Sequence, residues 1–205
     1  MELFPMFMKL TGRWCLVVGG GKVAEPKIQS LLQAGATVRV IALDVNERVS
    51  QWAREGSIVC ELRAFRPGDL EGQFLVIAAT DSDEVNHRIY AEARRREVLC
   101  NNVDDPEHCD FYYPAVVRRG RLQIAISTGG ESPALAQRLR AELEEQYGEE
   151  YAGWVSELGE TRRKLLAADL DPEQRRRRLH LLASRESFKR SIGSGAQPGK
   201  RKVRR

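Results

Sequence analysis

The sequence predicts an α/β protein that begins with a helix-covered parallel β-sheet and continues into a β-hairpin with one helix and a small helical end. The first observation is that short apolar runs alternate with amphipathic helical stretches, as in parallel strands joined by helices. The second is that this alternation stops after residue 110, where two β-rich segments follow a short distance apart. The predicted divisions are 1–113, 114–147 and 148–190, and the basic tail 191–205 has too few apolar residues to fold.

The apolar or β-rich runs expected to form the sheet are residues 16–18, 37–42, 57–62, 74–79 and 98–103. The run 74–79, FLVIAA, is apolar throughout, as expected for a strand buried on both faces. A helix is expected to follow it through Arg96, with Asp83 as a candidate N-cap. The apolar lead-in LFPMF, residues 3–7, is expected to cover an edge of the sheet.

A glycine-rich turn follows the first predicted strand. Gly19, Gly21 and Ala24 fit the pattern GxGxxG/A, in which the glycines allow a tight turn and a close approach of the backbone to a pyrophosphate. The N-terminus of the next helix would favour the phosphates. Asp44, which follows the second strand, is placed to bind a ribose 2′-OH and to repel a 2′-phosphate, so NAD is favoured over NADP. The alternative is a turn that holds no ligand, with Asp44 a solvated loop acid.

Polar residues also follow the fourth and fifth strands, at the edge where open α/β sheets bind ligands. Thr80 is a candidate cofactor contact, and Asp104 and Asp105 are candidates for acid–base chemistry. The alternative for the two aspartates is an ordinary turn before a proline. His108 and Cys109 come next, but two adjacent groups are too few for a metal site, so packing within the loop is favoured.

The segments 111–117 and 121–127 are expected to pair as a hairpin with its turn at 118–120. A helix opened by Ser132 and Pro133 follows, with leucines at four-residue spacing. A hairpin and one helix cannot bury their own faces. They therefore pack on a second copy or on the sheet of the same chain, and the spacing leaves both open. Apolar stripes then predict two more helices, the second after Pro172.

Charge is unevenly distributed along the chain. The net charge is −5 through residue 150 and +9 over residues 151–205, which suits either an anionic partner or a solvated basic tail. The sequence has no apolar run of membrane-spanning length and no secretory leader, so we expect a cytoplasmic protein. The four cysteines lack CxxC spacing and are expected to be buried thiols rather than disulfides or metal ligands.

Six motifs in order resemble one family, the precorrin-2 dehydrogenase/sirohydrochlorin ferrochelatase enzymes of siroheme synthesis. They are VVGGGKVAEPK (17–27), LLQAGA (31–36), IAATDSDEVN (77–86), CNNVDDP (100–106), FYYPAVV (111–117) and ISTGGESPALAQRLR (126–140). The resemblance covers about residues 1–145. It implies NAD-dependent oxidation of precorrin-2 to sirohydrochlorin and, in many members, insertion of Fe²⁺ as a substrate to give siroheme. It also implies a homodimer built through about residues 114–147.

The resemblance further implies the site residues. The essential aspartate of the family matches Asp104, as the base in dehydrogenation and as an aid to removing pyrrole protons when metal enters. The cofactor contacts carry over to Gly19, Gly21, Lys22, Val23, Leu43 and Asp44. Thr80 is added from its position at the end of a strand, and no resident metal site is expected.

The basic run Arg175–Arg178 is a candidate wall for the carboxylates of the tetrapyrrole, because guanidinium groups pair bidentately with carboxylates. No methyltransferase portion is found in these residues, so we do not expect the chain to make precorrin-2. Two alternatives remain open. One is a dehydrogenase that relies on a separate chelatase, and the other is a non-catalytic NAD-sensing module whose tail binds nucleic acid. Under the leading interpretation neither nucleic acid nor a membrane is an expected partner.

Overall fold

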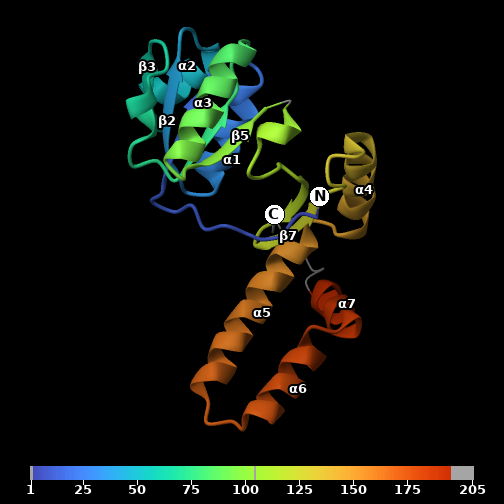
Figure 1. The fold of residues 1–205 in the computed structure, drawn as a ribbon. Coiled ribbons are helices and arrows are strands. Elements are labelled where there is room, and N and C mark those ends of the chain that lie inside the picture. The colour runs from blue at the N-terminus through green and yellow to red at the C-terminus, as the bar shows by residue number, and fades with distance from the viewer. Residues whose placement is uncertain (1, 104, 195–205) are drawn as a thin grey trace, which may run out of the picture. The chain divides into compact units, whose positions relative to one another are not determined.

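The computed structural model describes residues 2–103 and 105–194, with the backbone alone for 192–194. The chain divides into two compact units, Met1–Tyr113 and Pro114–Arg205. Each is described separately (Figure 1).

The first unit contains the predicted parallel sheet. Its strands are β1 (Trp14–Val18), β2 (Thr37–Ala42), β3 (Ile58–Leu62), β4 (Leu75–Ala78) and β5 (Leu99–Asn102). Their spatial order is β3-β2-β1-β4-β5, and all neighbouring strands are parallel. This is a Rossmann-like sheet. The order reverses at β1, so the crevice typical of such folds opens beyond the carboxyl ends of β1 and β4.

Two apolar layers, one on each face of the sheet, form the core. In β1 the side chains of Cys15 and Val17 pack in the layer of α1 (Ala24–Gln33) and α2 (Glu47–Arg54). Leu16 and Val18 pack in the other layer, under α3 (Asp83–Arg95), which crosses the sheet in Figure 1. Because a strand alternates its side chains between faces, the apolar run of β1 supplies both layers. Burial of each large aliphatic side chain stabilises the fold by roughly 1.5–3 kcal/mol.

The second unit joins a hairpin to helices. Strands β6 (Ala115–Arg119) and β7 (Leu122–Ile126) pair antiparallel, and α4 (Pro133–Gln146) packs against both. Three helices follow, α5 (Glu150–Ala167), α6 (Pro172–Leu182) and α7 (Arg185–Ser194). Figure 1 shows α5 and α6 running in opposite directions. The rings of Tyr151 and Trp154 on α5 contact that of Phe188 on α7, with centroids 4.3 and 4.9 Å away.

The hairpin begins later than predicted. The sequence places the first strand at 111–117 and the turn at 118–120, whereas β6 starts at Ala115 and the turn is Gly120-Arg121. The reason is a competing set of hydrogen bonds to β5. The Asp110 N–H donates to the Cys100 carbonyl at 2.8 Å, and Asn101 Nδ2 donates to the Phe111 carbonyl at 2.8 Å. These bonds hold residues 110–111 beside the parallel sheet.

The helical end also differs from the prediction. The helix expected after Pro172 is interrupted at Ala183-Ser184, where the Ser184 hydroxyl accepts a hydrogen bond from the Ser187 N–H at 3.2 Å. Phe188 therefore lies on a separate helix. That helix continues through Ser194, into the range expected to lack structure, and residues 195–205 lie outside the described part of the chain.

The lead-in segment does not cover an edge of the sheet as expected. The side chains of Phe4, Met6 and Phe7 are 63–81% exposed, and only Leu10 joins the core of this unit. No helix or strand forms over residues 2–10, so nothing in the segment's own backbone holds the three side chains against the sheet.

The structure describes the state of the cysteines and the character of the helices. The four cysteines are free thiols, but only Cys15 and Cys100 are buried as expected, whereas Cys60 and Cys109 are partly buried. Burial raises the pKa of Cys15 to about 11 and that of Cys100 to about 12. Within residues 2–103 and 105–194, none of the helices has the length and apolar character required to cross a membrane.

Candidate active site

The glycine turn after β1 lies directly beside the end of β4. Gly19 has a φ of +117°, and a Cβ built on it would lie 2.1 Å from the carbonyl oxygen of Ala79. A Cβ on Gly21 would meet no atom within 4 Å. Gly19 is therefore required by the fold itself, whereas Gly21 leaves open space above the turn. The neighbouring Lys22 is exposed and the Val23 side chain is 47% exposed.

The end of β2 forms the second wall of the turn. A Cβ on Gly20 would lie 2.7 Å from the Asp44 carbonyl oxygen and 2.4 Å from Val45 Cγ1. The Asn46 N–H donates to the Gly20 carbonyl at 2.9 Å. These contacts place the exposed residues Leu43 and Asp44 beside the glycine turn.

Helix α1 starts at Ala24 with no side-chain cap at Val23. The first N–H groups of a helix have no partner within the helix, and together with the helix dipole they favour an anion. The open space at Gly21 adjoins this helix end. The turn and the helix together can hold a phosphate or pyrophosphate.

Thr80 at the end of β4 is held by a buried amide. Its hydroxyl donates to Asn86 Oδ1 at 2.7 Å, and Asn86 Nδ2 donates to the Thr80 carbonyl at 3.0 Å. Asn86 is 4% exposed and lies on α3. The N-cap of α3 is Ser82, whose hydroxyl accepts from the Val85 N–H at 3.3 Å, and not Asp83 as proposed from the sequence. Asp83 is the first helical residue.

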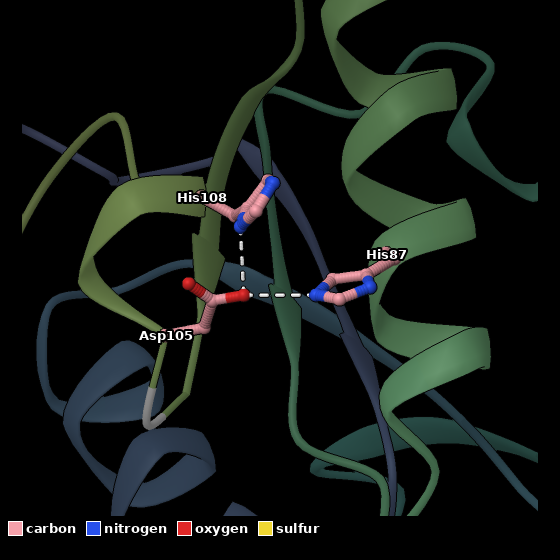
Figure 2. A group of neighbouring side chains, drawn as sticks. All are labelled: His87, Asp105 and His108. Carbon is pink, nitrogen blue, oxygen red and sulfur yellow. Dashed lines mark hydrogen bonds and ion pairs between the residues drawn. The ribbon is translucent and has the colours of Figure 1, made fainter.

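The loop after β5 holds a carboxylate between two imidazoles (Figure 2). Asp105 Oδ2 accepts from His108 Nδ1 at 2.7 Å and from His87 Nε2 at 3.0 Å. The hydrogen bond from His108, followed by that from His87, holds the pKa of the Asp105 carboxyl below its usual value. Asn102 Nδ2 also donates to Asp105 Oδ2, at 3.2 Å. Asp105 is thus an ionised hydrogen-bond acceptor.

Asp104, the predicted base, lies outside the described residues. The residues on either side of it in the loop are Val103 and Asp105. The Val103 N–H donates to the Ala78 carbonyl at 3.0 Å, and the Asp105 N–H donates to the Asn102 carbonyl at 3.2 Å. Val103 is therefore anchored to the end of β4 and Asp105 to the end of β5, both at the carboxyl edge of the sheet.

The structure brings the glycine turn, Leu43–Asp44 and Thr80 to one edge of the sheet, as their positions after parallel strands predict. The sequence reasoning missed Asn46, Asn86 and His87. Asn46 precedes a helix and caps it through the Val49 N–H at 2.9 Å, a position that local sequence could have indicated. Asn86 and His87 lie inside α3 and carry no such local indication.

Two family models match this chain. Residues 6–115 match the model described as "Putative NAD(P)-binding", and residues 119–146 match "Sirohaem biosynthesis protein central". With the Rossmann-like sheet and the glycine turn, the first match defines the class: this is an NAD(P)-binding α/β protein. The chain belongs to the siroheme-synthesis family of NAD(P)-binding proteins, as the sequence motifs implied.

Similar proteins agree with this assignment. "Siroheme synthase 2" of Pectobacterium atrosepticum is 42% identical over 144 residues, which are 70% of this chain and 31% of that protein. "Siroheme synthase 1" of Aeromonas hydrophila is 36% identical over 197 residues, 96% of this chain and 42% of that protein. The chain thus spans less than half the length of these relatives. The solved structure of "SirC, precorrin-2 dehydrogenase" matches with a TM-score of 0.77 and 26% identity over 94% of this chain and 100% of that chain.

Proposed function

We propose that the protein is a cytoplasmic precorrin-2 dehydrogenase that uses NAD to oxidise precorrin-2 to sirohydrochlorin. The observation that carries this proposal is the likeness to a precorrin-2 dehydrogenase structure over the whole of that chain. The glycine turn supports it, because the fold excludes side chains at Gly19 and Gly20 and leaves Gly21 open.

In this proposal the cofactor lies across the edge of the sheet. The pyrophosphate would rest on Gly21, Lys22 and Val23 at the N-terminus of α1. The exposed Leu43 side chain offers an apolar surface to the adenine, and Thr80 lies at the end of the neighbouring strand. Bound NAD supplies the hydride acceptor for the oxidation.

The choice of NAD rests on Asp44. This exposed carboxylate stands beside the glycine turn, where it would accept a hydrogen bond from the ribose 2′-OH and repel the 2′-phosphate of NADP. The comparisons describe NAD(P) binding in general, so this preference is a separate part of the proposal.

We assign the proton-accepting role to Asp104 rather than Asp105. The Asp105 carboxylate already accepts from three side chains, Asn102, His87 and His108, and its lowered pKa makes it a weak base. Asp104 precedes it in a loop whose flanking residues are anchored at the carboxyl edge. The family motif assigns the same residue.

The second unit is proposed to form a homodimer through residues 114–147. Only Ala136 is buried along α4, and the Leu135 side chain is 38% exposed although α4 packs on both hairpin strands. The leucines along α4 are thus only partly covered within one chain, and such an apolar face suits a second copy. Light scattering coupled to size exclusion should give twice the chain mass. In a Leu135→Glu variant the measured mass should fall to that of one chain. A wild type with the mass of one chain would contradict the proposed dimer.

Insertion of Fe²⁺ into sirohydrochlorin is proposed as a second activity, with the metal as a substrate.

Arginines on α6 are proposed to bind the tetrapyrrole substrate. Arg176, Arg177 and Arg178 are exposed, and their guanidinium groups suit the carboxylates of a tetrapyrrole. If replacing Arg175–Arg178 by Gln leaves the Michaelis constant for precorrin-2 unchanged at low salt, these arginines are not a substrate wall.

The dehydrogenase proposal is tested by incubating the protein anaerobically with precorrin-2 and NAD and recording NADH absorbance. We expect NADH and sirohydrochlorin to form together. Binding of NAD without NADH formation would instead identify a non-catalytic sensor. Adding Fe²⁺ or Co²⁺ to sirohydrochlorin, with and without protein, tests insertion separately through the visible spectrum.

A further inference from the structure

His87, Asp105 and His108 form a compact group of metal-ligating side chains. His87 comes from α3, Asp105 from the loop after β5, and His108 from η2 (Pro106–His108). One potential ligand atom from each residue lies within 4.8 Å of the other two. Figure 2 shows both imidazoles directed at the same carboxylate oxygen from different elements. From the sequence, only His108 and Cys109 were candidate ligands, and no metal site was expected. The fold adds His87, which α3 places close to Asp105 and His108.

The donor set and its spacing fit a divalent transition metal. Two imidazoles and one carboxylate, with open positions opposite, are a known arrangement for Fe²⁺, and imidazole ligands also suit Co²⁺, Ni²⁺ and Zn²⁺. Ligands about 2.1 Å from such an ion lie roughly 3.0–3.4 Å apart, for octahedral and tetrahedral angles respectively. The two contacts of Asp105 Oδ2, 3.0 Å to His87 and 2.7 Å to His108, are already close to that spacing. The ligand atoms of all three residues lie within 4.8 Å of one another, so binding a metal also requires the two imidazole rings to move closer together.

The surroundings hold the group in place. Asn102 Nδ2 donates to Asp105 Oδ2 at 3.2 Å, and Asn102 itself is 2% exposed. The His108 ring packs edge to face with the Tyr90 ring, with the ring centroids 4.8 Å apart. The backbone N–H of His108 donates to the backbone carbonyl of Asp105 at 3.1 Å. Outer-shell contacts of this kind orient metal ligands and fix their rings.

The charge and exposure of the group distinguish it from a structural ion pair. Among the described residues, the ion-pair partners of Asp105 are the two histidines, and no Lys or Arg pairs with it. The side chains are 53%, 27% and 37% exposed for His87, Asp105 and His108, so solvent reaches them. A structural zinc site has four protein ligands and is closed, whereas a site with three protein ligands keeps an open position for water or a substrate.

We propose that His87, Asp105 and His108 bind one exchangeable divalent transition-metal ion at the carboxyl edge of β5. Binding does not depend on the dehydrogenase or chelatase proposals. The bound ion would also be the one inserted into sirohydrochlorin. This second part rests on the proposed chelatase activity. No oxidation state changes at this site in either case.

Binding is tested with Co²⁺ alone, titrated into the full chain in the absence of tetrapyrrole while the visible d–d absorption is recorded. We expect one Co²⁺ per chain, and a loss of affinity of at least tenfold in His87→Gln and in His108→Gln. His180→Gln is the matched control, since His180 is the third histidine of the chain and lies on α6. It should bind Co²⁺ as the wild type does. Circular dichroism identifies any variant that fails to fold.

Three results would overturn the site: no saturable Co²⁺ absorption in the wild type, an equal loss in His180→Gln, or unchanged affinity in both His87→Gln and His108→Gln. The delivery step is tested by the Co²⁺ concentration that half-saturates insertion into sirohydrochlorin, which should rise in His87→Gln. If the wild type inserts no metal but still binds Co²⁺, the chelatase proposal fails and the metal site stands.

Discussion

Gly19 and Ala79 approach so closely that a Cβ on Gly19 would lie 2.1 Å from the Ala79 carbonyl oxygen. The register of β1 and β4 causes this contact, because Val18 pairs with Ala78 and the next residue of each strand begins its turn. The same contact sets the position of the glycine turn relative to Thr80. Packing between two neighbouring strand ends therefore shapes the proposed cofactor site.

Substitution of the two glycines separates folding from cofactor binding. Gly19→Ala should lower the free energy of unfolding by roughly 2–5 kcal/mol, from the positive φ and the clash with Ala79. Gly21→Ala should fold normally, because a Cβ there meets no atom within 4 Å, yet weaken NAD binding at least tenfold. Urea unfolding and calorimetric titration with NAD measure the two effects. Unchanged NAD affinity in a folded Gly21→Ala variant would remove the turn from the binding site.

Asp44 should determine the choice between NAD and NADP. In Asp44→Ser the ratio of kcat/KM for NAD to that for NADP should fall about 10- to 100-fold, since the 2′-phosphate is no longer repelled and the 2′-OH loses an acceptor. Glu47→Gln is a control on an exposed acid in the first turn of α2. An unaltered ratio in Asp44→Ser would show that Asp44 does not contact the ribose.

Asn86 should position the end of β4. Asn86→Ala leaves the partly buried Thr80 backbone groups without their amide partner and should cost roughly 1–3 kcal/mol of stability. We expect the KM for NAD to rise as well, because Thr80 loses its orientation. The measurement is urea unfolding together with steady-state kinetics. A variant with normal stability and KM would contradict this positioning role.

An ion pair between the buried Asp69 and the partly buried Arg63 makes the stability of the first unit depend on acid pH. Burial by itself raises the pKa of the Asp69 carboxyl, but hydrogen bonds from Arg63 at 2.6 and 2.8 Å and from the Arg66 N–H at 2.8 Å outweigh it, so the pKa is lowered. The contribution to stability is therefore complete above the unfolded pKa of roughly 3.9 and is lost as the pH falls through the lower folded value.

Asp69→Asn should accordingly lower the free energy of unfolding at neutral pH by roughly 1.5–3 kcal/mol, because Arg63 loses its charged hydrogen-bond partner Asp69 but keeps its ion pair with Glu61. Below about pH 4 the wild type should lose this advantage, and the two unfolding curves should converge. Glu47→Gln, which breaks the exposed pair with Arg54, should change little at any pH. Parallel curves for the wild type and Asp69→Asn across this range would contradict the account.

The sheet could be predicted because its strands are encoded locally. The run 37–42 is strand β2 without change of bounds, and FLVIAA contains β4, all of whose residues are buried. The glycines likewise predicted the turn after β1. The structure shows why a glycine is needed there, because a Cβ on Gly19 would clash with the Ala79 carbonyl oxygen. These features follow from side-chain period and backbone freedom alone.

Contacts between distant residues could not be predicted in the same way. The late start of β6 depends on bonds from residues 110 and 111 to β5, which local β propensity does not reveal. Asn86 and His87 are unremarkable helical residues until α3 lies beside the ends of β4 and β5. The family motif assigned the base to Asp104, but the two histidines that engage Asp105 are brought together only by the fold.

In the proposed reaction NAD is reduced at this edge of the sheet with Asp104 as the base. The most direct test compares anaerobic NADH formation from precorrin-2 in the wild type, Asp104→Ala and Asp105→Asn, with NAD affinity measured alongside. We expect Asp104→Ala to bind NAD normally but to form NADH at least a hundredfold more slowly, and Asp105→Asn to keep most of the rate. Wild-type rates in Asp104→Ala, or loss of activity in Asp105→Asn alone, would contradict this expectation.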